Sequence, residues 1–284
     1  MNILFIGGGN MTQAILGGLI AQKIAHDGFR VVEPAEETRA ALDRLGVESH
    51  AFLSSELLNC DVIMLCVKPQ MMQSAIAPIG GKLRSQLVIS IAAGVSTSSL
   101  AHWLGEGTAP YGNIVRTMPN TPALIHAGIT GLFASAGVSA KSRQIAETLL
   151  GAVGKTVWFG DEAMLDAVTA VSGSGPAYVF YFIEALEEAA IELGFDRDTA
   201  RLFATETFLG GAQLAASSTE APRVLRERVT SRRGTTQAAI ESFEAHALKQ
   251  GFIDGVKAAS ARSRELGLEL GAAPLTNGVS GGKH

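Results

Sequence analysis

The sequence lacks the features that define several large protein classes. Its two cysteines, Cys60 and Cys66, lie in one apolar stretch and form neither a disulfide framework nor a set of metal ligands. Lysine and arginine (23) do not outnumber aspartate and glutamate (27), so no nucleic-acid-binding surface is expected. No basic segment precedes the first apolar run, which argues against a secretory signal. These absences favour a cytoplasmic protein that binds no nucleic acid and no metal.

A long hydrophobic run is also missing. The longest uncharged stretch rich in aromatic residues, 167–183, is interrupted by the sequence Ser172-Gly173-Ser174-Gly175-Pro176, so it is not expected to cross a membrane. Even so, 47% of the 284 residues are hydrophobic and 18% are charged, which excludes disorder for most of the chain. The length is typical of one or two domains.

Residues 1–160 have the pattern of an α/β domain. Predicted strands cover residues 3–6, 31–33, 62–67, 87–91, 114–118 and 156–159, and predicted helices cover 11–22, 36–45, 71–79 and 141–153. Most of the strands are apolar without strict alternation, which is typical of strands covered on both faces. The alternation of strands and helices therefore predicts a doubly wound parallel sheet.

Residues 161–270 have the pattern of an all-α domain. Predicted helices cover 176–193, 198–216, 222–229, 235–243 and 248–266. The first of these is apolar on nearly all sides, so it must be buried either in a domain core or in a subunit interface. Residues 271–284, rich in glycine and serine, are predicted to form a disordered tail.

A glycine-rich turn links the first predicted strand to the first predicted helix. In the sequence Gly7-Gly8-Gly9-Asn10-Met11, Gly7 permits a tight turn and Gly9 lets the backbone approach a pyrophosphate at the helix N-terminus. The third position of the dinucleotide-binding pattern is Thr12 instead of glycine or alanine. In this context the turn favours a dinucleotide site over a simple strand-to-helix connection.

Glu33 follows the second predicted strand. A carboxylate there accepts hydrogen bonds from a ribose 2′-hydroxyl and repels a 2′-phosphate, which favours NADH. Capping of the turn before Pro34 explains the residue equally well, and Arg30 and Arg39 lie near enough to complicate the choice. The coenzyme is therefore left as NADPH or NADH.

Three further loops follow predicted strands, where an open α/β sheet binds its ligands. They contain Val67-Lys68-Pro69, Ala92-Ala93-Gly94 and the rigid segment 118–122 around Asn120. An exposed lysine and a stiff turn are the plain structural alternatives.

In the second half of the chain, the turns 172–176 and 230–236 precede helices. They can present N–H and hydroxyl donors to a carboxylate, although ordinary N-capping explains each of them alone. Together, these features favour hydride transfer to a small anionic substrate.

Six motifs in order make the chain similar to the pyrroline-5-carboxylate reductase family. The resemblance spans residues 1 to about 268. The first five motifs are Gly7-Gly8-Gly9-Asn10-Met11, Val67-Lys68-Pro69, Ser90-Ile91-Ala92-Ala93-Gly94-Val95, Arg116-Thr117-Met118-Pro119-Asn120-Thr121-Pro122 and Val171-Ser172-Gly173-Ser174-Gly175-Pro176-Ala177-Tyr178. The sixth is a single turn that contains Val229-Thr230-Ser231 and, after two intervening residues, Gly234-Thr235-Thr236.

The resemblance implies a fold, an activity and site residues. The fold is an N-terminal Rossmann-type doubly wound sheet (1–160) followed by an all-α dimerisation domain (161–270) in a homodimer that often assembles further. The activity is NAD(P)H-dependent reduction of 1-pyrroline-5-carboxylate to L-proline. The implied coenzyme-binding residues are Ile6, Gly7, Gly8, Gly9, Asn10, Met11, Glu33, Val67, Lys68, Pro69, Ala92, Ala93 and Gly94. The implied substrate-binding residues are Asn120, Ser174, Gly175, Ser231, Gly234, Thr235 and Thr236, of which Thr236 and Ser231 are the candidate catalytic residues.

The chain departs from the family pattern at three places. Arg233 replaces a glycine, so this residue is expected either to avoid positive φ or to carry a cost of roughly 1–2 kcal/mol, and Arg232 or Arg233 could attract the substrate carboxylate. Thr12 is expected to loosen the packing of helix on strand. Glu33 stands where many relatives have serine or threonine, so the resemblance implies NADPH as the usual coenzyme whereas Glu33 favours NADH.

Two alternatives stay open on the residues alone. A reductase of the β-hydroxyacid dehydrogenase kind needs a catalytic lysine in its helical domain, where this chain offers Lys249 and Lys257 before the tail, neither in a glycine-flanked motif. A non-catalytic dinucleotide sensor has no need of a carboxylate-binding turn such as 231–236.

Overall fold

The computed structural model describes residues 1–24 and 28–271, which form two compact units. The first unit contains Met1–Gly173 and returns for the described residues from Ala259 onward, and the second contains Ser174–Ala258. The domain boundary near residue 160 stays a prediction. Of the predicted disordered tail, Gly271 ends the last helix, and residues 272–284 lie outside the described residues.

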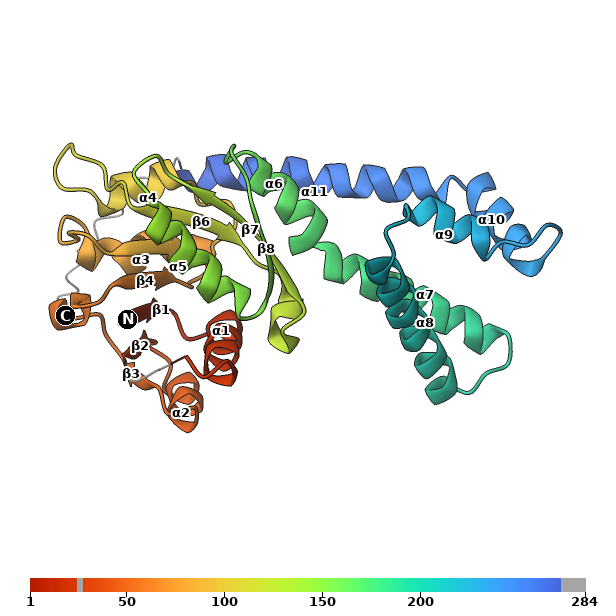
Figure 1. Ribbon diagram of the computed structural model, residues 1–284, viewed down its shortest axis with the longest axis horizontal. Coiled ribbons are helices and arrows are strands. Elements are labelled where there is room, and N and C mark those ends of the chain that lie inside the picture. Colours follow the sequence, from red (N-terminus) through yellow and green to blue (C-terminus); the bar gives the residue numbers. More distant parts are fainter. Residues whose placement is uncertain (25–27, 272–284) are drawn as a thin grey trace, which may run out of the picture. The chain divides into compact units, whose positions relative to one another are not determined.

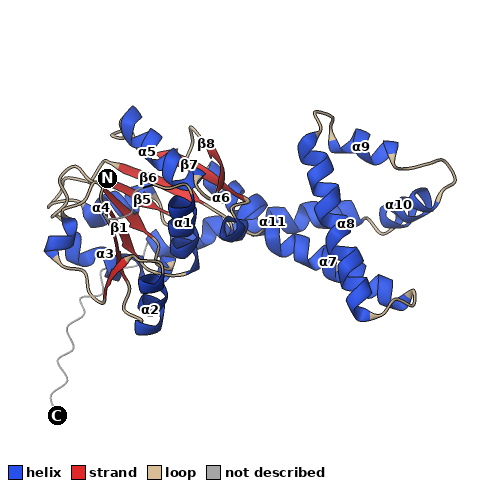
Figure 2. Ribbon diagram, turned by 60° about the horizontal axis from the view of Figure 1, so that its bottom comes forward, coloured by secondary structure: helices blue, strands red, loops and turns tan. Residues whose placement is uncertain are grey.

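A mixed, mostly parallel sheet forms the centre of the first unit (Figure 2). Its strands are β1 (Ile3–Ile6), β2 (Phe29–Val32), β3 (Glu48–His50), β4 (Val62–Leu65), β5 (Leu87–Ser90), β6 (Ile114–Met118), β7 (Gly128–Ala134) and β8 (Gly154–Trp158). Their order is β3-β2-β1-β4-β5-β6-β7-β8; β1 to β6 are parallel, β7 is antiparallel to β6, and β8 is parallel to β7.

The predicted α/β sheet is confirmed, with two strands that the sequence pattern did not reveal. The short strand β3 has the polar sequence Glu48-Ser49-His50, and β7 contains Gly128 and Gly131, which weaken a strand signal. The antiparallel pairing of β6 with β7 makes the sheet mixed instead of wholly parallel.

Two apolar layers cover the sheet because alternate residues of each strand face opposite sides. Ile3 and Phe5 of β1 pack against one layer, and Leu4 and Ile6 pack against the other. The first layer is covered by α1 (Asn10–Ala21), α2 (Glu36–Arg44) and α5 (Ala140–Gly151), and the second by α3 (Met72–Ile76) and α4 (Thr97–Leu104). Burial on both faces explains the unbroken hydrophobic strands.

The predicted helix 71–79 is shorter than expected. Its middle is α3, and single turns of tighter 3₁₀ helix, Pro69–Met71 and Ala77–Ile79, flank it. Pro78 lies in the last of these turns, where it lacks the N–H group that a longer α-helix needs. The first unit also contains α6 (Met164–Val168) and the π-helical turn Thr169–Gly173.

The second unit is helical, as predicted (Figure 1). It contains α7 (Gly175–Glu192), α8 (Arg197–Ser217), α9 (Pro222–Arg228), α10 (Thr235–Ala245) and the first part of α11 (Leu248–Gly271). Helix α8 begins after Asp196, whose carboxylate accepts the Thr199 N–H at 3.0 Å. Hydrogen bonding by the Thr199 side chain and by this N–H lowers the pKa of Asp196.

The aromatic helix α7 is not buried within the chain. None of its residues is classed as buried, and Phe180 is 66% exposed. The sequence predicts that this helix is buried either in a domain core or in a subunit interface. Within the described residues, no domain core buries it.

Candidate active site

The glycine turn lies at the point where the strand order reverses. Strand β1 has β2 on one side and β4 on the other, which is the position where doubly wound sheets bind ligands. Gly7 has φ +100°, and a Cβ on it would lie 2.8 Å from the carbonyl carbon of Cys66, so no other residue fits. Gly9, the N-cap of α1, faces open space: a Cβ there would meet no atom within 4 Å. A phosphate can therefore reach the backbone at Gly9, Asn10 and Met11.

Thr12 tightens the turn. The residue is 1% exposed, and its hydroxyl donates to the carbonyl oxygen of Gly7 at 2.6 Å. This hydrogen bond ties the first turn of α1 to the glycine turn, and the expectation that Thr12 loosens the packing of helix on strand stays a prediction.

Glu33 reaches back from the end of β2 to the glycine turn. Its carboxylate accepts the Gly8 N–H at 2.8 Å and the Ala35 N–H at 2.9 Å. The side chain of Arg39 donates to the carbonyl oxygens of Glu33 and Pro34. A carboxylate and a guanidinium thus lie at the edge where the second ribose of a dinucleotide is bound in this fold.

The other predicted coenzyme residues also follow the carboxyl ends of parallel strands. Ile6 is the last residue of β1; Lys68 is exposed in the loop after β4 and precedes Pro69. Ala92, Ala93 and Gly94 form the loop after β5, in which Ala92 is buried and Gly94 has φ +75°. The parallel arrangement of β1, β2, β4 and β5 places all of these residues at one edge of the sheet.

Asn120 lies beyond the end of β6 in the same unit. The side chain is nearly buried, and its Oδ1 accepts the Ile129 N–H at 3.0 Å. That bond fixes the amide, and no partner of its Nδ2 group is found among the described residues.

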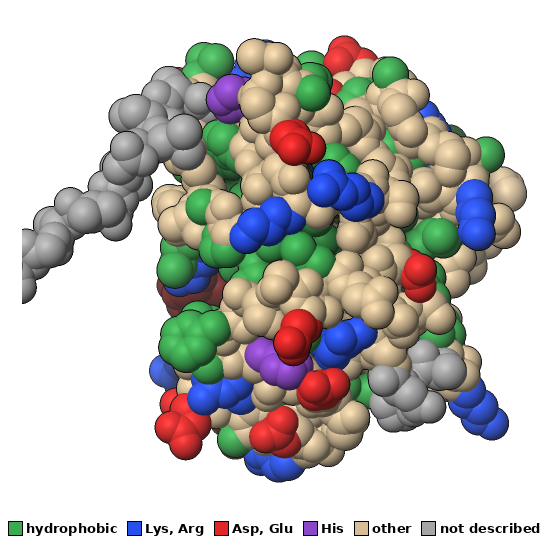
Figure 3. All heavy atoms as spheres, turned by 90° about the vertical axis from the view of Figure 1, so that its left-hand side faces the viewer, with side chains coloured by type: hydrophobic (Ala, Val, Ile, Leu, Met, Phe, Trp, Pro, Cys, Tyr) green, Lys and Arg blue, Asp and Glu red, His purple; other side chains and the backbone are tan. Residues whose placement is uncertain are grey.

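The Cys66 thiol beside the glycine turn is not an activated nucleophile. Burial raises the pKa of Cys66 to about 12, an effect that a hydrogen bond with Thr12 opposes, so the thiol stays protonated at neutral pH. Within residues 1–24 and 28–271 no cluster of histidine, cysteine or acidic side chains could hold a metal ion. Figure 3 shows acidic and basic side chains interspersed on one face of the molecule.

The turn 231–236 belongs to the second unit. Gly234 is the N-cap of α10, and its N–H donates to the carbonyl oxygen of Ser231 at 3.0 Å. No side chain caps this helix, so the N–H groups of its first turn, from Thr235 and Thr236 on, are available to an anion. Thr236 is half-buried, whereas Ser231 and Thr235 are exposed.

Arg233 has φ +59°, so the expectation that it avoids positive φ is wrong. Its N–H donates to the Gln237 Oε1 at 2.7 Å, which holds the residue in this conformation. The alternative expectation, a cost of roughly 1–2 kcal/mol for a left-handed residue other than glycine, applies instead.

Ser174 and Gly175 begin the second unit. Ser174 is the N-cap residue of α7 but has helical dihedral angles, and its side chain makes no capping hydrogen bond. Gly175 is the first residue of the helix. The structure thus divides the predicted site: the coenzyme residues and Asn120 lie in the first unit, and Ser174, Gly175 and the turn 231–236 lie in the second.

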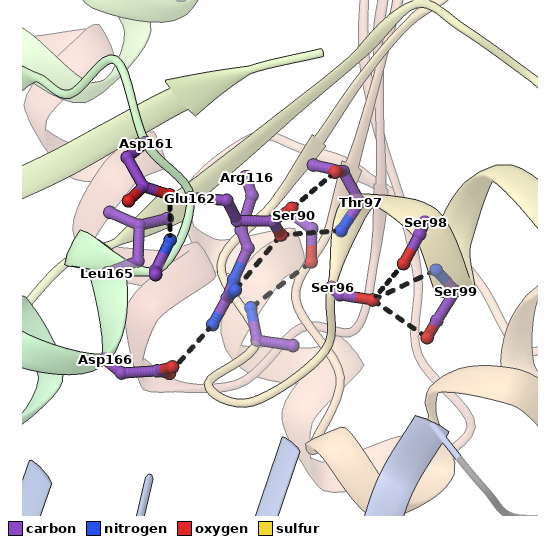
Figure 4. A network of polar contacts seen from close by, with 12 residues as sticks. Ser90, Ser96, Thr97, Ser98, Ser99, Arg116, Asp161, Glu162, Leu165 and Asp166 are labelled. Atoms are coloured by element: carbon purple, nitrogen blue, oxygen red, sulfur yellow. Dashed lines mark hydrogen bonds and ion pairs between the residues drawn. The ribbon is translucent and has the colours of Figure 1, made fainter. Parts of the chain in front are cut away.

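Sequence reasoning missed a buried ionic cluster near the loop after β5. Arg116 of β6 is 5% exposed and pairs with Glu162 and Asp166 (Figure 4). A signal was present, because an arginine in the middle of an otherwise apolar strand needs a buried partner.

A doubly wound sheet with a glycine turn at its switch point, followed by a helical unit, defines the class of NAD(P)-binding oxidoreductases. Residues 2–94 match the family model described as "NADP oxidoreductase coenzyme F420-dependent", and residues 162–266 match "Pyrroline-5-carboxylate reductase dimerisation". Pyrroline-5-carboxylate reductase of Pseudomonas aeruginosa is 45% identical over 95% of this chain and 98% of its own length. The enzyme of Haemophilus influenzae is 42% identical over 93% and 97%.

Solved structures of pyrroline-5-carboxylate reductases are also similar to this chain. The pyrroline-5-carboxylate reductase of Coxiella burnetii superposes with a TM-score of 0.84 at 39% identity, over 93% of this chain and 98% of that one. The Plasmodium falciparum enzyme with NADP bound gives 0.81 at 27% identity, over 94% and 98%. The chain belongs to the pyrroline-5-carboxylate reductase family and is an oxidoreductase of proline biosynthesis. This membership decides against the β-hydroxyacid dehydrogenase and sensor alternatives. The described helices include none that is long and apolar enough to span a membrane.

Proposed function

We propose that this chain reduces 1-pyrroline-5-carboxylate with a coenzyme bound along the glycine turn and a substrate bound at the N-terminus of α10. The bound coenzyme supplies a hydride from C4 of its nicotinamide to the C=N carbon of the substrate. The observation that best supports the coenzyme site is the open space at Gly9, at the point of the sheet where the strand order reverses. Asn10 and Met11 bind the pyrophosphate from the same turn, whereas Gly8 donates its N–H to the Glu33 carboxylate and holds that side chain at the site.

The remaining coenzyme residues bind the two ends of the dinucleotide. Glu33 binds the adenosine ribose, because it follows β2 in the half of the sheet that contains β1 to β3. Ile6 and the loop 67–69 lie at the switch point, and Ala92, Ala93 and Gly94 lie in the other half. We therefore assign the loop 92–94, together with Asn120, to the nicotinamide end of the coenzyme.

The turn 231–236 binds the substrate in this proposal. The carboxylate of the substrate accepts hydrogen bonds from the N–H groups of Thr235 and Thr236 and from the Ser231 hydroxyl. The partial positive charge of the helix N-terminus favours an anion at this place. The protonated imine is the better electrophile. The Thr236 hydroxyl accepts a hydrogen bond from the ring N–H and holds the developing amine, with Ser231 as its neighbour. Ser174 and Gly175 line the substrate site from the start of α7.

The working enzyme is a homodimer formed by the second unit. Its helices leave Phe180, Tyr181 and Phe203 more than half exposed, and apolar cavities of about 390 and 780 Å³ lie beside α7, α10 and the first part of α11. These features fit a surface that a second copy covers, and such dimers can assemble further.

We propose NADH as the preferred coenzyme. The Glu33 carboxylate at the end of β2 repels a 2′-phosphate, and Arg39 is already engaged by the carbonyl oxygens of Glu33 and Pro34. Consumption of NADH and of NADPH at 340 nm with 1-pyrroline-5-carboxylate tests this. A higher kcat/KM with NADH is expected; equal values, or a higher one with NADPH, would contradict the assignment of Glu33.

A further inference from the structure

The cluster around Arg116 joins four parts of the first unit that are distant in sequence (Figure 4). The Nη1 of Arg116 lies 3.1 Å from Glu162 Oε1, and its Nη2 lies 3.5 Å from Asp166 Oδ1. Asp166 also accepts the hydroxyl of Ser263 from α11 at 3.0 Å. Two carboxylates therefore share one guanidinium, whose fork reaches both of them. We call Arg116, Glu162, Asp166, Thr97 and Ser263 the Arg116 cluster.

The cluster anchors the far end of the loop after β5. Glu162 accepts both the N–H and the hydroxyl of Thr97, each at 2.7 Å, and Thr97 is the first residue of α4. Three residues before it lies Gly94, the last residue of the proposed coenzyme loop Ala92-Ala93-Gly94. The position of Glu162 thus sets where this loop ends.

The near end of the loop is fixed from β5 and β6. Ser90 is paired in register with Arg116; its Oγ accepts the Ala92 N–H at 3.3 Å, and its carbonyl oxygen accepts the Thr117 hydroxyl at 3.0 Å. Both ends of the loop are therefore attached to residues that neighbour or belong to the cluster.

The third side of the loop is closed by the last turns of α11. A Cβ on Gly267 would lie 3.2 Å from the carbonyl oxygen of Gly94, and a Cβ on Gly94 would lie 3.4 Å from Leu270 Cδ1. Gly94 itself has φ +75°, which a side chain would strain. Ser263 holds this part of α11 to the cluster through Asp166.

We propose that Arg116, Glu162 and Asp166 are positioning residues that set the coenzyme loop, and with it the affinity for the nicotinamide end of the coenzyme. If the guanidinium is lost, two neighbouring carboxylates face each other without a cation and move apart. Glu162 then no longer holds Thr97, and the loop shifts. The proposal rests on the proposed function, because it requires that loop 92–94 binds the coenzyme.

The test measures the dissociation constant of NADH, by titrating its fluorescence, for the full-length chain and its variants. Arg116→Lys keeps a charge but loses the fork, and Thr97→Val keeps the shape but loses one hydrogen bond to Glu162. We expect Thr97→Val to weaken NADH binding about fivefold and Arg116→Lys to weaken it by roughly tenfold or more. The KM for the imine at saturating NADH should change less than twofold.

Two controls separate a positioning role from a merely structural one. Thr130→Val is a matched change at a buried threonine of β7 outside the cluster, and it should leave the dissociation constant unchanged. Because Arg116→Lys can unfold the protein, the milder variant Thr97→Val decides the test. Its dissociation constant for NADH is measured at a temperature where circular dichroism shows that it is fully folded. An unchanged dissociation constant in folded Thr97→Val overturns the proposal, whatever happens to its melting temperature.

Gly9→Ala distinguishes failure of this proposal from failure of the proposed function. If Gly9→Ala abolishes NADH binding and the cluster variants leave it unchanged, the coenzyme site stands and the positioning role is wrong. If Gly9→Ala also leaves NADH binding unchanged, the coenzyme site itself is wrong.

Discussion

The two units of this reductase bury their hydrophobic residues in different ways. In the first unit the strands are covered on both faces by helices of the same chain, and β1, β4 and β5 are entirely buried. In the second unit the helices α7, α9 and α10 contain no buried residue. The first unit thus buries its strands with helices of its own chain, whereas the exposed helices of the second unit support the proposed dimer.

The largest expected effect tests that dependence directly. Phe180→Asp places a carboxylate on α7, and if a partner covers this surface the cost is several kcal/mol, or roughly a 10³-fold weaker dimer. Analytical ultracentrifugation should show the change from dimer to monomer. Phe52→Asp is the matched control, because Phe52 is 83% exposed in the first unit. A dimer that survives Phe180→Asp would contradict the interface.

The next largest effect concerns the chemistry of the second unit. Thr236→Val removes the hydroxyl and keeps the shape, so kcat/KM for the imine should fall by about 10²-fold, a usual magnitude for a positioned group that handles a proton. The dissociation constant of NADH should change much less. Thr236→Ser keeps the hydroxyl and should retain most of the activity. Equal losses in catalysis and in NADH binding would count against direct contact with the substrate.

Two glycines of the first unit separate folding from coenzyme binding. Gly7→Ala forces a Cβ against the backbone of Cys66 at φ +100°, so a loss of stability of about 2 kcal/mol or more is expected in thermal or urea unfolding. Gly9→Ala meets no protein atom and should leave stability within about 0.5 kcal/mol, yet weaken NADH binding at least tenfold, because the methyl group occupies the place of a phosphate. A loss of stability in Gly9→Ala with unchanged NADH binding would show that Gly9 serves only the fold.

A smaller effect is expected for coenzyme choice. Glu33→Ser removes the carboxylate and frees the Gly8 N–H, so the ratio of kcat/KM for NADPH to that for NADH should rise about tenfold, the equivalent of one lost charge repulsion of about 1.4 kcal/mol. Glu36→Ser is the control, since it removes the same charge from an exposed position at the start of α2. If both variants change the ratio equally, the effect is general electrostatics and not contact with the ribose.

The smallest effects are expected at the two arginines of the substrate turn. Arg232→Ala and Arg233→Ala should each raise the KM for the imine two- to threefold at low salt, since exposed charges contribute about 0.2–1 kcal/mol, and this effect should fade as salt is added. Arg233→Gly should change the free energy of unfolding by less than about 1 kcal/mol, because relief at φ +59° is offset by the greater freedom of glycine when unfolded. An unchanged KM in both alanine variants would exclude attraction of the carboxylate.

Much of this architecture could be predicted from particular residues. The apolar strands, the glycine turn and the change to helices after residue 160 follow from local patterns, and the six motifs indicated the family. Strand β7 could not be found because its glycines and its antiparallel pairing to β6 depend on the rest of the sheet. The Arg116 cluster could not be found because its members lie up to 166 residues apart, from Thr97 to Ser263, and only the fold brings them together.

The return of α11 to the first unit has a consequence for synthesis on the ribosome. Ser263, Gly267 and Leu270 supply a hydrogen bond, a close backbone contact and a core side chain to a sheet whose other parts emerge far earlier. Folding of the first unit during synthesis therefore cannot finish before α11 has left the ribosome. The first unit begins at the start of the chain, yet its last native contacts depend on α11.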